Sequence, residues 1–204
     1  DLDFTSTPYA DLVDESKLLQ NRKLVSLNEP NPILSLFGPK VENGITDESI
    51  QIIGNRVAAR TVSTYPTMTF GDSNIRDGDP IADRYAFYEY SNRIVIAIAD
   101  GCNWGDRYKK AADRARSSTM SYLKEKRSKM LTVGDASLYL LRAFNHAHNC
   151  ICEKIDPDEQ IGSTTLLAGM SLEIEGEDGG DSEWVFVCTS VGDPKAFLIR
   201  DESK

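Results

Sequence analysis

One unbroken apolar run constrains the fold of this chain more than any other feature. Residues 94–99 are six apolar residues that lead directly into the pair Asp100-Gly101 and a turn of small residues. The run is too short for a buried helix of ordinary length, and it is rich in β-branched residues. It therefore predicts a strand that is buried on both faces.

Asp100, at the exit of this strand, has two interpretations. Burying a carboxylate costs free energy unless a partner compensates its charge, and a metal ion is one such partner. Alternatively, Asp100 only opens the turn and caps the following helix, because Asp-Gly is a common turn dipeptide. The segment by itself leaves both interpretations open.

Composition excludes several classes of protein. The 204 residues have the apolar content of a globular domain, or of part of a larger one. No apolar stretch approaches the roughly 20 residues of a membrane span, and the first residues lack the pattern of a signal peptide. A net charge of −9 argues against nucleic acid or a membrane as partner. The four cysteines lack zinc spacing, so we expect reduced thiols in an intracellular protein, cytoplasmic or nuclear.

Secondary-structure patterns are clear only after residue 83. The expected strands are residues 84–90, 93–99, 163–174, 183–190 and 195–200, and the expected helices are residues 106–127 and 132–155. Thr132 and Asp135 form a capping-box pattern at the start of the second helix. Strands, two consecutive helices and strands again predict an α+β fold with antiparallel hairpins.

The first 66 residues predict little. Residues 9–27 have apolar positions near helical spacing, and residues 51–60 have room for a short strand. We therefore divide the chain into an N-terminal arm of uncertain structure, residues 1–66, and a domain, residues 67–204.

The histidines do not form a recognisable catalytic motif. His146 and His148 are two positions apart on the second expected helix, so their side chains diverge by roughly 200° and cannot share one metal ion. His148 falls on a predicted apolar stripe, and we interpret both histidines as packed residues. No serine or cysteine lies in a motif of the Ser-His-Asp type. The expected stripe consists of Leu141, Phe144, His148, Ile151 and Ile155.

Four short motifs occur in an informative order. They are Ala82-Asp83-Arg84, the loop at residues 100–105, Gly162-Ser163-Thr164-Thr165, and Val191-Gly192-Asp193. With the two helices between the second and third motif, this order resembles the metal-dependent protein phosphatases of the type 2C (PPM) class. The resemblance covers about two thirds of the chain, from about residue 70 to the end.

The resemblance implies a fold and an activity. The fold is a β-sandwich of two antiparallel sheets, flanked by antiparallel helix pairs. The activity is hydrolysis of phosphoserine or phosphothreonine in a phosphoprotein by water that two Mg²⁺ or Mn²⁺ ions activate. On this match Asp83, Asp100 and the carbonyl of Gly101 bind metal, and Asp193 helps to hold the third ion that some members carry.

Departures from the family pattern affect catalysis more than metal binding. Cys102 stands where the family has a histidine with a general-acid role, and Ala82 stands where it has a glutamate. Arg76 is the candidate for phosphate binding, although its spacing to Asp83 differs by a couple of residues. Two further metal aspartates of the family, in Ser-Asp-Gly and a late Asp-Asn, have no counterpart in these residues.

Two hypotheses follow from the resemblance. The first is a serine/threonine phosphatase whose domain is incomplete in these residues, so that its remainder, outside this chain, is an expected partner. The second is a pseudophosphatase that keeps the fold as a binding or scaffold module. Retention of Asp83 and Asp100 favours the first, and the change to Cys102 favours the second.

Overall fold

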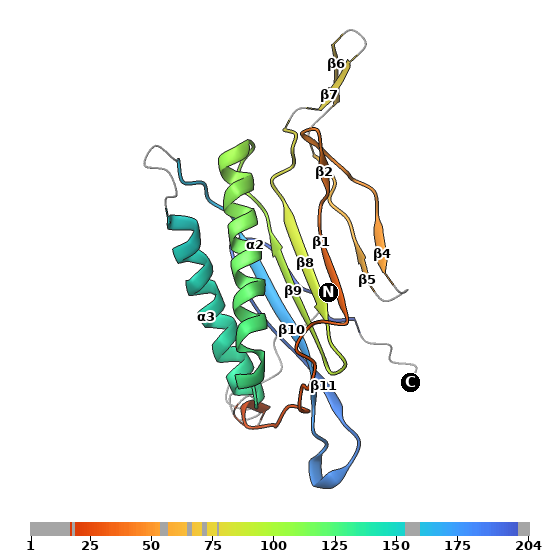
Figure 1. Ribbon diagram of the computed structural model, residues 1–204, viewed down its shortest axis with the longest axis vertical. Coiled ribbons are helices and arrows are strands. Elements are labelled where there is room, and N and C mark those ends of the chain that lie inside the picture. The colour runs from red at the N-terminus through yellow and green to blue at the C-terminus, as the bar shows by residue number, and fades with distance from the viewer. Residues whose placement is uncertain are drawn as a thin grey trace, which may run out of the picture.

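The computed structural model describes residue 17 and residues 19–53, 57–64, 67–70, 73–76, 78–153 and 160–199. Its centre is a five-stranded antiparallel sheet of order β1-β8-β9-β10-β11 (Figure 1). The strands are β1 (Leu34–Gly38), β8 (Arg84–Glu89), β9 (Arg93–Ala99), β10 (Leu166–Ile174) and β11 (Glu183–Val191). The β8–β9 hairpin and the strands over residues 163–174 and 183–190 are confirmed. β1 comes from the range that the sequence assigned to the arm.

Two helices cover one face of this sheet (Figure 1). They are α2 (Asp106–Lys126) and α3 (Val133–Cys152), and the short 3₁₀ turn Arg127–Lys129 follows α2 directly. The expected capping box is present, because Thr132 accepts a hydrogen bond from the Asp135 amide while the Asp135 carboxylate accepts one from the Thr132 amide. A second 3₁₀ turn, Glu177–Gly179, lies in the loop between β10 and β11.

Small side chains let the helices approach the sheet closely. The buried alanines of the two helices are Ala111, Ala112, Ala115, Ala136, Ala143 and Ala147. They pack against the inner face of β9 and β10, where Ala97 and Ala168 are fully buried. The core therefore combines alanines with larger buried residues such as Met120, Leu123 and Met170.

The expected apolar stripe of α3 is confirmed only in part, because Phe144 and Ile151 pack against the core whereas two other members do not. Leu141 is 59% exposed, and His148 is also exposed. The buried face of α3 is centred one position away, and it carries Ala143 and Ala147 together with Leu140. Both histidines lie on the surface and are not packed residues.

The outer face of the sheet is covered only in part. The hairpin of β4 (Gln51–Ile53) and β5 (Val57–Ala59) packs against residues of β1, β8 and β9 there. On β9, Ile98 remains 46% exposed, so the strand at residues 93–99 is confirmed but its burial on both faces is not. Two more hairpins, β2–β3 (Val41–Glu42 and Ile45–Thr46) and β6–β7 (Thr67–Phe70 and Ser73–Arg76), lie outside the sheet.

The strand expected at residues 195–200 is not present over residues 195–199, the part of it that the structure describes. Residues 194–199 have no regular structure, and residues 195–198 line a pocket with side chains of β9, β10 and β11. Pro194 has no amide hydrogen to donate, and Gly192 turns the chain at φ 93° directly after β11. These two features end strand pairing.

The α+β class is confirmed, whereas the second sheet of the expected sandwich does not appear in the described ranges. The division into arm and domain at residue 66 stays a prediction. Residues 1–16 and 200–204, which include parts of the expected N-terminal helix and last strand, lie outside the described residues. No described helix has the length and apolar character needed to cross a membrane.

Candidate functional site

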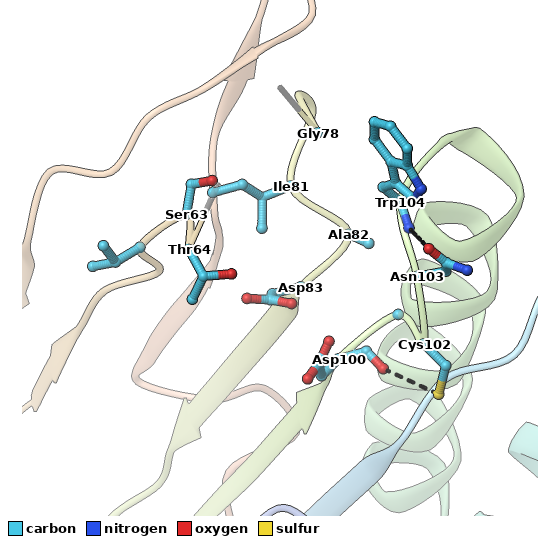
Figure 2. A pocket seen from close by; sticks show the side chains of 12 residues that line it. Ser63, Thr64, Gly78, Ile81, Ala82, Asp83, Asp100, Cys102, Asn103 and Trp104 are labelled. Carbon is cyan, nitrogen blue, oxygen red and sulfur yellow. Dashed lines mark hydrogen bonds between the residues drawn. The ribbon is translucent and has the colours of Figure 1, made fainter. Parts of the chain in front are cut away.

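Strand pairing brings two acidic residues together at one edge of the sheet. Arg84 pairs with Ala99 across β8 and β9, so Asp83 immediately precedes one strand and Asp100 immediately follows the other. Both line a pocket of about 340 Å³, and their carboxylates lie near each other (Figure 2). The convergence that the hairpin pattern predicts is therefore present in the geometry, while the role of the two residues as metal ligands stays a prediction.

The pair is electrostatically costly when both carboxylates are charged. Partial burial, a hydrogen bond with Asp100 and the charge of Asp100 together raise the pKa of Asp83 from its ordinary 3.8 to about 7, against the opposing charge of Arg84. The hydrogen bond needs a proton on one of the two carboxyl groups. A cation between them removes this cost, so the arrangement suits a positively charged ligand.

The loop that carries Asp100 is fixed by the Gly-Ser-Thr-Thr motif. The Asp100 amide donates to Thr165 Oγ1 at 3.2 Å, and the Asp100 carbonyl accepts from the Thr165 amide and from Thr164 Oγ1, both at 2.8 Å. Cys102 donates its amide to the Ser163 carbonyl. Two motifs that lie about sixty residues apart therefore form one structural unit.

Glycine is required at position 101 by close packing. A Cβ atom there would lie 2.6 Å from the Cβ of Ala82 and 2.9 Å from the Tyr108 carbonyl oxygen. The Gly101 carbonyl accepts a hydrogen bond of 2.6 Å from the Asn103 amide. Because a carbonyl oxygen has two lone pairs, this bond leaves one for the predicted metal contact.

Arg84 positions the segment that carries Asp83, a role that the sequence did not reveal. Its side chain is 5% exposed and donates to the carbonyls of Ile81 and Asp83. Its Nε forms an ion pair of 2.9 Å with Asp113 of α2. The charge that holds this backbone in place also favours the ionised form of Asp83.

The opposite wall of the pocket comes from the range assigned to the arm. Val62, Ser63 and Thr64 line it, and the Thr64 hydroxyl points toward the Asp83 carboxylate (Figure 2). No sequence pattern indicates this contribution, because these residues lie in an irregular segment without a motif. Trp104, which is 52% exposed, lines the pocket on the side of α2.

The other predicted site residues are placed less favourably. Cys102 lines the pocket, but its Sγ is directed toward the Asp100 carbonyl, 4.0 Å away, and not toward the carboxylates (Figure 2). Arg76 ends β7, and its side chain is outside the described residues. Asp193 is exposed beyond β11 and is absent from the pocket lining as described.

The donor set fits a hard divalent cation, though incompletely. Two carboxylates and a carbonyl are the oxygen ligands that Mg²⁺ and Mn²⁺ prefer. Within the described ranges, no third acidic, histidine or cysteine side chain joins them. A metal ion bound between these groups would therefore need further ligands from water, substrate or other protein groups.

Comparison with known proteins found a relative that is described as PP2C-like. A Drosophila melanogaster protein described as a PP2C-like domain-containing protein is 29% identical over 129 residues, which cover 59% of this chain. This similarity supports a partial PP2C-like domain within the chain. The match covers 17% of the Drosophila protein, so this PP2C-like segment corresponds to a small part of that relative's length. No family model and no solved structure matches the chain significantly.

Proposed function

We propose that the PP2C-like domain belongs to a metal-dependent phosphatase that acts on phosphoserine and phosphothreonine in proteins. The observation that carries this proposal is the pairing of Asp83 and Asp100 in one pocket, where their hydrogen bond and mutual charge raise the pKa of Asp83. A fold that served only as a scaffold would gain stability by replacing either carboxylate.

The residues of the pocket have separate tasks in this proposal. Asp83, Asp100 and the Gly101 carbonyl hold Mg²⁺ or Mn²⁺, which when bound lowers the pKa of water and supplies hydroxide at neutral pH. Arg84 keeps the backbone of Asp83 in place, and Thr165 keeps that of Asp100. The hydroxyl of Thr64, on the opposite wall, is available to hydrogen-bond a phosphate oxygen.

The rest of the domain would complete both the sandwich and the metal site. The outer face of the sheet leaves Ile98 46% exposed, and the tail beside it leaves Phe197 81% and Leu198 66% exposed. A second sheet packed on this face would bury them. In this proposal that second sheet also supplies the missing acidic ligands and places Asp193 near a third ion.

A second candidate function has its own support. Cys102 directs its thiol away from the carboxylates, so a general acid at the family's histidine position is missing. A pseudophosphatase that binds metal and phosphoprotein without turnover accounts for this arrangement. The two functions share the metal site and differ in hydrolysis.

The test uses the protein that contains this domain, with a phosphothreonine peptide and Mn²⁺ or Mg²⁺. We expect release of phosphate that requires the ion and is lost in Asp100→Asn, whereas Asp181→Asn, a change in an exposed loop, retains it. Binding of the ion without phosphate release would support the pseudophosphatase. Activity that persists in excess chelator would exclude a metal-dependent mechanism.

A further inference from the structure

The last two turns of α3 carry two histidine–cysteine pairs. His146 Nε2 lies 3.7 Å from Cys150 Sγ, and His148 Nε2 lies 3.7 Å from Cys152 Sγ. Both histidines and Cys152 are exposed, and Cys150 is half-buried. None of these four side chains belongs to the buried face of the helix, which consists of Val133, Ala136, Leu140, Ala143 and Ala147.

The spacing within each pair matches the requirement of a single metal ion. Residues four positions apart on a helix lie one above the other on the same face. Bonds of about 2.3 Å to sulfur and about 2.0 Å to nitrogen, at a tetrahedral angle, place the two donor atoms about 3.5 Å apart. The observed separation of 3.7 Å therefore needs almost no rearrangement to become a chelate. Without an ion, the same distance suits a thiol–imidazole hydrogen bond.

The two pairs act separately. Because His146 and His148 are two residues apart, the pairs lie about 200° apart around the helix axis. The first pair faces the flank toward α2, where the ring of His146 lies 5.3 Å from that of Tyr122. This contact restricts the imidazole before any ligand binds.

We propose that His146 with Cys150, and His148 with Cys152, are two independent bidentate sites for a thiophilic divalent cation, Zn²⁺ being the natural ligand class. Sulfur and imidazole donors select such ions, whereas the oxygen donors at Asp83 and Asp100 select hard cations. Binding forms one metal–sulfur and one metal–nitrogen bond per site, and the thiol proton is released to solvent. Water completes each coordination shell.

The experiment uses the chain with Cys102→Ser and Cys188→Ser, so that Cys150 and Cys152 are the remaining thiols. Cd²⁺ is titrated while the thiolate-to-metal charge-transfer absorption is recorded, and Zn²⁺ is then added as competitor. We expect two Cd²⁺ ions per chain, both displaced by Zn²⁺. A response of one ion or none, or Cd²⁺ that Zn²⁺ does not displace, would overturn the proposal.

Matched variants assign the ligands. His146→Ala and Cys150→Ala should each weaken one of the two binding events at least tenfold, and His148→Ala should weaken the other. Asn149→Ala, on the same turn but outside both pairs, should change neither. Circular dichroism shows whether the helix is retained. Equal Cd²⁺ affinity in His146→Ala, His148→Ala and the parent would show that the thiols bind alone and would refute the chelates.

Discussion

Replacing Asp83 with asparagine should stabilise the domain at neutral pH in the absence of divalent ions. The folded state raises the pKa of Asp83 from 3.8 to about 7, so the folded protein disfavours the charged form. Protonated Asp83 therefore makes its full contribution to the free energy of unfolding below about pH 4. This contribution declines as the pH rises and is lost above about pH 7. Asparagine cannot ionise and escapes this loss.

The size of the effect follows from the rise in pKa. About 1.4 kcal/mol for each pKa unit gives an upper limit of about 4 kcal/mol at pH 8. Asp83 is only partly buried, and solvent screening reduces the expected gain to about 2 kcal/mol. At pH 5, where only part of the difference has developed, the gain should be below about 1 kcal/mol.

Urea unfolding in chelator at pH 5 and pH 8 measures this difference. Asp100→Asn should give a smaller gain, because it removes the repulsion but not the burial of Asp83, and the double variant should be less than additive. Asp181→Asn, in an exposed loop, should stay within about 0.5 kcal/mol of the parent. Equal free energies of unfolding for Asp83→Asn and the parent at both pH values would refute the reasoning.

Three further predictions concern the supports of the site and of α3. Gly101→Ala should destabilise the fold by about 1–3 kcal/mol, because its Cβ would lie 2.6 Å from that of Ala82; an unchanged urea midpoint would contradict this packing. Thr132→Ala should cost about 1 kcal/mol by removing the cap of α3, and thermal unfolding measures it; a neutral result would mean that the cap is redundant. Arg84→Met should cost about 1–3 kcal/mol because two carbonyls lose their donor, and amide exchange should quicken around Asp83; unaltered exchange would argue against the positioning role.

Local sequence patterns predicted the helices and strands, whereas the face that a helix buries depends on tertiary packing. The apolar run at residues 94–99 and the capping box at Thr132 depend on neighbouring residues alone, so the strand and the start of α3 were predictable. The buried face of α3 was predicted only in part, because alanine gives a weak periodic signal and leucine a strong one, whereas the buried face includes Ala136, Ala143 and Ala147.

The candidate site likewise has features that the sequence predicts and features that depend on tertiary structure. Asp83 and Asp100 flank two strands of one hairpin, so their proximity followed from the pattern. The hydrogen bonds from Arg84 to the backbone before β8 depend on the path of the chain through space. The same is true of the pocket wall that Ser63 and Thr64 form. An arginine beside an aspartate, or two hydroxyl residues in an irregular segment, gives no signal that distinguishes these roles from ordinary surface positions.

The bonds between Asp100 and the two threonines have a consequence for the order of folding. They join positions 64 and 65 residues apart, so we expect the loop at Asp100 to reach its final geometry only when β10 pairs with β9. Contacts of such long sequence separation are entropically expensive to close and tend to form late. An ion bound at the completed loop should then leave the folding rate unchanged and slow unfolding, so that its influence is on the lifetime of the native state.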